Sequence, residues 1–213
     1  EELRDVHMRG ASAGGSRMVE GTWTKHLHYQ GEEILHAAAF GTYAPTQVGT
    51  TPYYTNRATS ASSLQGTFLS LFEDRETSTW EIDSAKVSQV TVSGSTGQRI
   101  QVAYDLMGRA LDTAGDLTWG TVTQNANSKD NHALMSHLAF YVNDSSAGDV
   151  TGGSAIGLSD FSVQFNNNLS GYRANSDYIL EPTRDGFFEV SGSITLPTYE
   201  DNTYVAEVLD KTL

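Results

Sequence analysis

The chain has 213 residues, of which 13 are basic and 26 acidic, giving a net charge of −13, and this length is enough to bury a hydrophobic core. A hydrophobic content of 38% with 20 Gly and 4 Pro is typical of a β-rich globular protein with many turns. The charge argues against tight wrapping of nucleic acid, the absence of Cys excludes disulfides and thiolate metal sites, and no apolar run reaches the roughly 18 residues of a membrane span.

The N-terminal part is expected to hold an arm, a strand, a helix and a long loop. Residues 1–17 are polar and Gly-rich, as in an arm. Residues 18–29 alternate like an amphipathic strand. Residues 31–41 predict a short helix, because apolar side chains recur at helical spacing after two acidic residues and before a glycine. Residues 42–63 contain two prolines and are expected to form a long loop.

The middle of the chain carries the clearest signal. Strands are expected at 64–73 and 77–82, followed by a hairpin over 85–106 that turns at Gly94–Gly97. The return strand has the period of two that a half-buried antiparallel strand requires. Its apolar face is Ile100, Val102, Tyr104 and Leu106, and its other face is Arg99, Gln101, Ala103 and Asp105.

The remainder alternates between loops and strands, and we expect a single domain over residues 1–213. Residues 107–134 show no sustained hydrophobic periodicity and predict a second long loop. The further expectations are a short strand at 133–142, a loop at 143–157, strands at 160–166, 177–181 and 187–197, and a closing helix at 201–209.

Two segments far apart resemble each other. Val19-x-Gly21-x-x-Thr24 near the start is echoed by Val190-x-Gly192-x-x-Thr195 near the end. A duplicated half explains the match, and so does chance similarity between two amphipathic strands.

The residues show no convergent catalytic group, so we expect neither an enzyme nor a cofactor. His26 and His28 lie two apart on one strand face, which suits two ligands of a Zn or Ni site. A third ligand would have to come from His7, His36, His132 or His137, and two exposed imidazoles are the simpler interpretation. The acidic cluster of Glu73, Asp74 and Glu76 is expected to be a solvated turn.

The two long loops carry aromatic side chains in polar surroundings, as is common at protein contact sites. These residues are Tyr43, Tyr53, Tyr54 and Trp119. The alternative is that they cap the core of their own subunit.

Several phrases together resemble a known family. They are YQGEEILHAAAFG, the stretch from LQGTFLSLFEDRETSTWEIDSAKVSQV to QVAYDL, DFSVQFNNNL, and ILEPTRDGFFEVSGSITLPTYEDNTYVAEVLD. In this order they resemble the major tail tube protein of long-tailed, siphovirus-like bacteriophages and of related gene transfer agent tails. The resemblance covers most of residues 18–209.

The resemblance implies a mainly β fold: an antiparallel β-sandwich or half-barrel with one or two short flanking helices and long loops. It further implies hexameric rings, closed into a barrel by strand edges and stacked into a tube through which DNA passes without specific binding. The partners would be sister copies, the tape measure protein, and the terminator and tip proteins. The protein would be located in the virion tail, and the tail would be assembled in the host cytoplasm.

Within that picture, uncharged polar and acidic side chains would face the lumen, and loops would bridge subunits and rings. The expected lumen-facing residues are Gln101, Asp105, Ser162, Gln164, Glu189, Ser191 and Ser193. The expected inter-subunit contacts are Tyr43, Tyr53, Tyr54 and Trp119. Lys86 and Arg99 are cationic exceptions, expected to pair with Asp105, Glu81 or a neighbouring subunit, or to point away from the channel.

Three other interpretations remain. A tail terminator or connector ring would share the architecture without polymerising. A carbohydrate-binding β-sandwich would use the loop aromatics to stack on sugar rings. A metal-dependent hydrolase would use His26 and His28.

Overall fold

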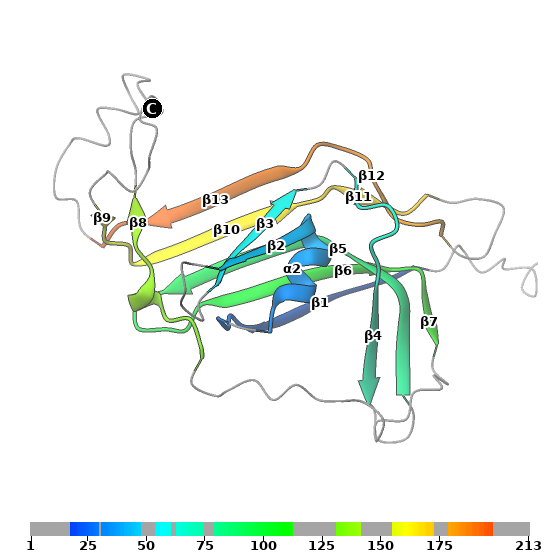
Figure 1. Cartoon of the computed structure of the whole chain (residues 1–213), viewed down its shortest axis with the longest axis horizontal. Helices are drawn as coiled ribbons and strands as arrows, with labels where there is room; N and C mark the ends of the chain where they lie inside the picture. The colour runs from blue at the N-terminus through cyan, green and yellow to red at the C-terminus, as the bar shows by residue number, and fades with distance from the viewer. Residues whose placement is uncertain are drawn as a thin grey trace, which may run out of the picture.

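The computed structural model describes residues 18–29, 31–47, 54–60, 63–74, 79–112, 131–141, 155–172 and 179–197. This part of the chain is mainly β, with antiparallel sheets and one α-helix (Figure 1). Its long elements are β1 (Val19–His26), α2 (Glu33–Phe40), β2 (Gly41–Gln47), β3 (Tyr54–Ser60), β4 (Leu69–Asp74), β5 (Thr79–Ser95), β6 (Gln101–Gly108), β10 (Asp160–Asn166) and β13 (Glu189–Thr195). Its short elements are β7 (Ala110–Asp112), the 3₁₀ helix η2 (Met135–His137), β8 (Phe140–Tyr141), β9 (Ala155–Ile156), β11 (Leu169–Ser170) and β12 (Thr183–Arg184).

The large sheet has the strand order β1-β6-β5-β10-β13, and all four of these ladders are antiparallel. Its centre is the hairpin β5–β6, which turns just after Ser95, as expected from the sequence. The first half of β5 leaves this sheet and pairs instead with β4 and β7. Figure 1 shows that half of β5 bending away beside β4 and β7.

The bend has a local cause at Ser84. Ser84 has a φ of 53°, and the β4–β5 register shifts there, from Leu69 opposite Ala85 to Leu71 opposite Ile82. A bulge of this kind bends the strand and increases its twist. The two strands expected at 77–82 and 85–95 are therefore one bent strand.

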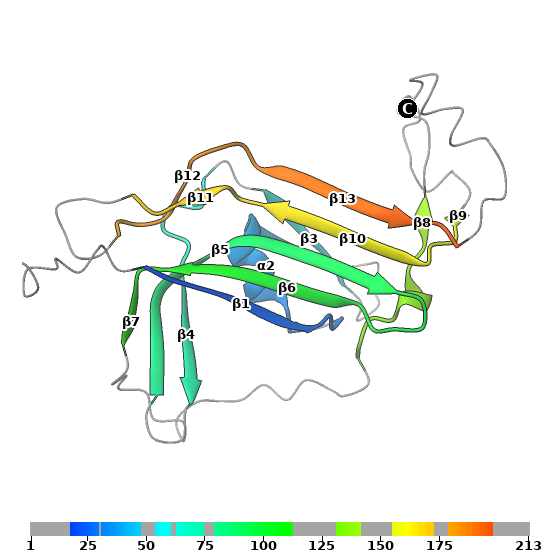
Figure 2. The ribbon, with the colours of Figure 1, turned by 180° about the vertical axis from the view of Figure 1, so that it is seen from behind.

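Helix α2 covers one face of the large sheet. Glu33 lies in its first turn, which suits the helix dipole, and Gly41 ends it with a φ of 85°. The helix was predicted from the sequence and is confirmed. Figure 2 shows the opposite face of the sheet without a helix over it. The buried core between helix and sheet contains Leu35, Ala38, Ala39, Val87, Val90, Val102, Tyr104 and Leu106.

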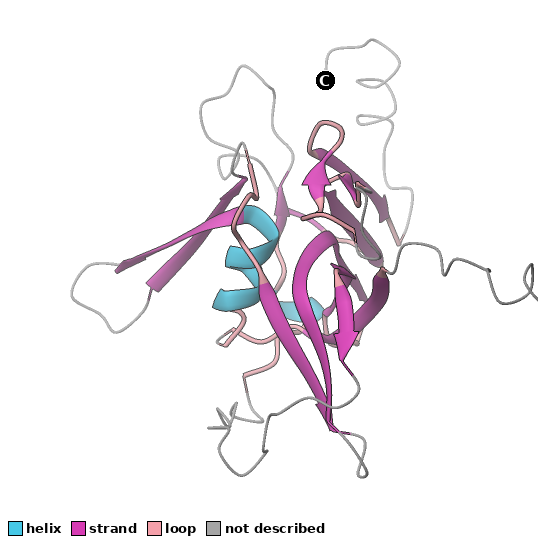
Figure 3. Ribbon diagram, turned by 90° about the vertical axis from the view of Figure 1, so that its right-hand side faces the viewer, coloured by secondary structure: helices cyan, strands magenta, loops and turns pink. Residues whose placement is uncertain are grey.

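Residues 42–63 are not a loop throughout, as the sequence had suggested. β2 and β3 form an antiparallel ribbon from the pair Gly41–Ser60 to the pair Gln47–Tyr54. Pro45 is tolerated because a two-stranded ribbon has free edges, where a strand residue need not donate to a ladder. Figure 3 shows the ribbon projecting from the end of the helix.

Other boundaries also differ from expectation. The strand expected at 64–73 begins only at Leu69, and residues 107–112 still belong to β6 and β7 rather than to a loop. The strand expected at 133–142 is a 3₁₀ turn followed by the two residues of β8. The arm at 1–17 and the closing helix at 201–209 lie outside the described residues.

Two features of the fold are negative and apply to the described ranges only. The sheet does not close into a barrel within one subunit. No described helix is long and apolar enough to cross a membrane.

Candidate functional site

The face of the large sheet opposite the helix carries all seven residues that were expected to line a lumen. Directly opposed residues of antiparallel strands project on the same side. The cross-strand rows are Thr22–Asp105–Gln89–Asn166–Glu189, then Thr24–Ala103–Thr91–Gln164–Ser191, and then His26–Gln101–Ser93–Ser162–Ser193. The period of two in each strand, combined across five strands, therefore builds one continuous polar surface, which we call the polar face.

The polar face is anionic. Its described strand residues include the carboxylates of Glu20, Asp105, Asp160 and Glu189. Within the four ladders the register places one lysine on the same side, Lys86 opposite Met107, but its side chain is only 1% exposed. Arg99, which precedes Gln101 in the same alternation, is exposed and pairs with Leu134 in an isolated β-bridge. A surface with carboxylates and no available ammonium repels phosphate at short range.

Asp105 is held in place by its row neighbours. Its carboxylate accepts hydrogen bonds from Thr22 Oγ1 at 2.6 Å and from Gln89 Nε2 at 2.8 Å. In the next row, Ser191 Oγ donates to Gln164 Oε1 at 3.3 Å. The first two bonds link β1, β6 and β5, and the third links β10 to β13. The side chains that make them are directed at one another along the sheet.

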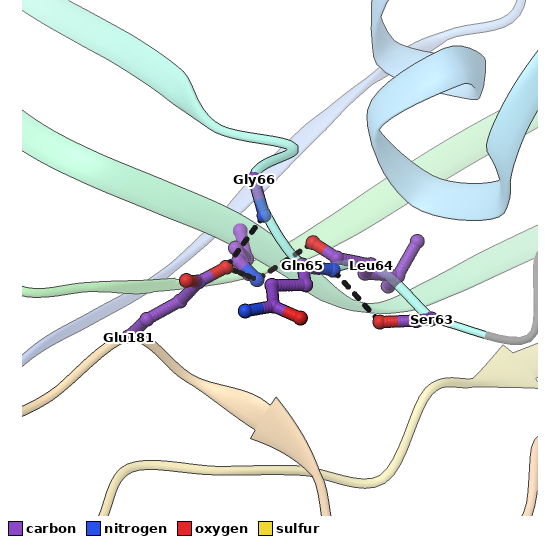
Figure 4. A network of polar contacts seen from close by, with 6 residues as sticks. Ser63, Leu64, Gln65, Gly66 and Glu181 are labelled. Carbon is purple, nitrogen blue, oxygen red and sulfur yellow. Dashed lines mark hydrogen bonds and ion pairs between the residues drawn. The ribbon is translucent and has the colours of Figure 1, made fainter.

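The segments that contain Leu64 and Glu181 keep the Lys86 ammonium away from the polar face. Its ammonium donates to the Leu64 carbonyl at 2.7 Å and to Glu181 Oε1 at 2.5 Å. The same carboxylate oxygen accepts the Gly66 backbone N–H at 2.7 Å (Figure 4). The Lys86 hydrogen bond is the largest cause that lowers the pKa of Glu181. Neither Asp105 nor Glu81, the partners expected from the sequence, contacts this ammonium.

Among the described elements, α2 covers the middle of the opposite, apolar face. Val102 and Tyr104 beneath α2 are fully buried, whereas Trp23 on β1 is 44% exposed. On β13, Val190 is 57% exposed and Ile194 is 45% exposed. Large apolar side chains exposed on both outermost strands are typical of a surface that a partner covers.

Those outermost strands also have free backbone edges. Among the described residues β1 pairs only with β6, and β13 pairs only with β10. Each leaves a row of amide and carbonyl groups that can add another strand. The site is therefore a polar face bounded by two edges that combine open backbone with exposed apolar side chains.

The histidines form a half-buried cluster rather than two exposed imidazoles. His28 and His132 face each other across an isolated β-bridge with ring centroids 4.3 Å apart, and the His26 ring lies 5.7 Å from His132. His137 instead bonds Tyr29 Oη at 2.8 Å. In the described part of the chain, no group of three or more His, Cys, Asp or Glu residues is arranged to hold a metal ion.

Glu32 anchors this corner and was missed by the sequence analysis as a functional residue. It is 3% exposed and accepts from Tyr104 Oη at 3.0 Å, while Lys25 Nζ lies 3.0 Å from its other oxygen. Burial, reinforced by the Glu32 charge, raises the pKa of Tyr104. Its only signal in the sequence was its place at the start of the expected helix, where the structure makes it the N-cap residue, so its ion pair with Lys25 could not be predicted.

The aromatic contact candidates are only partly described. The backbones of Tyr43 and Tyr54 belong to the projecting β2–β3 ribbon, where Tyr43 is opposite Ala58 and Tyr54 is opposite Gln47. Tyr53 and Trp119 lie outside the described residues, as does His7.

Comparison with known proteins identifies a family. The model of a family described as phage tail tube protein matches residues 1–213, the whole chain. No curated protein matches significantly.

Proposed function

We propose, since the chain belongs to the phage tail tube protein family, that its subunits close into hexameric rings through the edges β1 and β13. The family makes this a structural protein of the virion tail that self-assembles into a tube. The free edges of the large sheet, with their exposed apolar side chains, carry the proposal for how it does so. Joining one subunit's β13 to the next subunit's β1 satisfies the open amides and carbonyls of both strands.

The polar face then lines the lumen of the ring. Gln101, Asp105, Ser162, Gln164, Glu189, Ser191 and Ser193 would form its inner wall, because they share the side of the sheet that no described helix covers. Thr22 and Gln89 already donate to Asp105, and the carboxylates of this face repel a phosphate. DNA would slide through such a lumen without being bound.

Contacts between successive rings would come from projecting segments. The β2–β3 ribbon, with Tyr43, Tyr53 and Tyr54, is the first candidate to dock on the adjacent ring, and the region of Trp119 is the second. In this proposal the chain acts as one domain over residues 1–213, without catalysis or a cofactor. The tape measure protein would occupy the lumen before DNA, and terminator and tip proteins would cap the two ends of a tail assembled in the host cytoplasm.

Electron microscopy and sedimentation of the purified protein test this proposal. The wild-type chain should form rings or tubes, and Ile194→Lys, which places a charge in the apolar part of the β13 edge, should leave folded monomers. The matched control is Ile34→Lys, because Ile34 is 74% exposed on α2, away from both edge strands. A wild-type monomer that binds glycan would favour the carbohydrate-binding interpretation, and rings that never stack would favour the terminator interpretation.

A further inference from the structure

The directions of the two edge strands constrain how neighbouring subunits meet. Four successive antiparallel ladders connect β1 to β13, so β1, β5 and β13 run one way, while β6 and β10 run the other way. Figure 1 shows the arrowheads of β5 and β13 at the same end of the sheet. The two free edges of one subunit are therefore parallel to each other in chain direction.

Rotational symmetry preserves that relation in a closed ring. A head-to-tail ring places a different surface of each subunit on its neighbour, and rotation about the ring axis does not reverse a strand along that axis. β13 of one subunit and β1 of the next must consequently run in the same direction. An even number of alternating strands would have given an antiparallel contact, but the described path from β1 to β13 has five strands.

We infer that each junction between subunits is a parallel pairing of β13 with β1 of the next copy, inside an otherwise antiparallel barrel. This rests on the proposed ring and goes beyond it by fixing the direction of the contact. Parallel ladders have slanted hydrogen bonds and are slightly less stable per residue than antiparallel ones. The junction is thus the weakest ladder in the ring and depends on side-chain burial to hold.

The apolar sides of the two edges supply that burial. Each edge alternates large and small residues in the same order along the chain, with Val19, Gly21 and Trp23 on β1, and Val190, Gly192 and Ile194 on β13. In the parallel alignment that places the glycine of each edge beside a large residue of the other, Val190 lies beside Gly21 and Trp23 lies beside Gly192. An indole over an edge glycine stabilises a strand pair, and a Cβ added at Gly21 would meet nothing within 4 Å in the isolated subunit.

Cysteine cross-linking reads the strand direction, and the chain offers a background free of Cys. Double variants combine Glu20→Cys, Thr22→Cys or Thr24→Cys with Glu189→Cys, Ser191→Cys, Ser193→Cys or Thr195→Cys, all on the polar face. Within one subunit β1 and β13 are four ladder spacings apart, about 19 Å, which is too far for a disulfide. Every disulfide therefore joins two subunits and gives a ladder of multimers on a non-reducing gel, after electron microscopy has shown that rings form.

For a parallel junction, moving the β1 cysteine to a higher residue number should move its best cross-linking partner on β13 to a higher residue number as well. The pairs at positions 22 and 191 and at positions 24 and 193 should be among the strongest. Partners that fall in number as the β1 position rises would show an antiparallel junction and overturn the inference while leaving the ring intact. Rings without any cross-link would also overturn it, because the two edges then do not meet. Wild-type protein that forms no ring would instead contradict the proposed function itself.

Discussion

Lys86 and Glu181, 95 positions apart in the chain, form an ion pair in which Nζ lies 2.5 Å from Oε1. The lysine side chain is 1% exposed and the glutamate side chain is 28% exposed. A cation that the strand register would place on the polar face is thereby neutralised and covered by the segments of Leu64 and Glu181. The pair has two consequences: it stabilises the fold, and it preserves the anionic character of the proposed lumen.

Removing the carboxylate should destabilise the subunit more than removing both charges. In Glu181→Ala the buried ammonium keeps the Leu64 carbonyl as its hydrogen-bond acceptor and the Phe68 ring 5.0 Å away. We expect the free energy of unfolding to fall by about 2 kcal/mol, less than for a fully buried pair because Glu181 is partly exposed. Lys86→Met combined with Glu181→Ala should recover part of this loss. Denaturant unfolding measures both, with the exposed Glu20→Ala as control. Equal losses in the single and double variants would show that the pair is not the cause.

The same pair gives a pH dependence of known sign. The pKa of Glu181 is lowered from 4.5, chiefly by the Lys86 hydrogen bond. A lowered carboxyl pKa contributes stability that is present above the unfolded value and is lost as the pH falls through the folded value. We expect the stability difference between wild type and Glu181→Gln to be constant above about pH 5.5 and to shrink below pH 4.5. A difference that grows on acidification would contradict this assignment.

Asn167 joins the helix to the sheet and should be intolerant of change. Its side chain is buried, Nδ2 donates to the carbonyls of Ala39 at 2.7 Å and Val87 at 3.1 Å, and Oδ1 accepts from Arg184 Nη2 at 2.6 Å. Asn167→Ala leaves buried carbonyls unpaired and should cost about 2–3 kcal/mol of stability in thermal or denaturant unfolding.

The neighbouring Asn166 provides the matched control for that substitution. Its Oδ1 accepts only the backbone N–H of Asn168, so Asn166→Ala should cost well under half as much. Equal costs at the two positions would mean that the helix-to-sheet bonds of Asn167 contribute nothing specific.

What the sequence predicted well was local in origin. Period-two alternation in β6, β10 and β13 depends only on neighbouring residues, and it was enough to group Gln101, Ser162 and Ser193, which the structure aligns in one row. The helix was equally predictable, because its acidic start and the terminal Gly41 both lie within one short stretch of sequence.

What it missed depends on long-range pairing. The Lys86–Glu181 bond and the Asn167 bonds to Ala39 and Val87 join segments about 80 or more positions apart, which no local pattern encodes. The bend at Ser84 was read as a gap between two strands, because a non-glycine residue at positive φ has no strong sequence signature. The β2–β3 ribbon was missed because its prolines and polar residues resemble those of a loop.

His36 should make the subunit less stable as the pH falls below neutrality. Burial is the main cause that lowers its pKa from 6.5, so the folded state resists a proton that the unfolded chain accepts. Stability therefore rises with pH between the folded value and 6.5. The variant His36→Gln should show a flatter dependence in thermal unfolding between pH 5 and 7. An unchanged slope would contradict the assignment of this pH dependence to His36.

Adding positive charge to the polar face should impede DNA without dismantling the tube. Gln101 and Gln164 lie on the interior strands β6 and β10, away from both edges, so Gln101→Lys combined with Gln164→Lys should leave ring formation unchanged by electron microscopy. Ammonium groups repeated in every ring would attract phosphate and slow genome ejection several-fold, more at low ionic strength than at high, because salt screens the attraction. Glu at the same two positions is the control for size and polarity, and should eject at the wild-type rate or faster. Normal ejection by particles that carry the two lysines would show that this face of the sheet is not the wall that the genome passes.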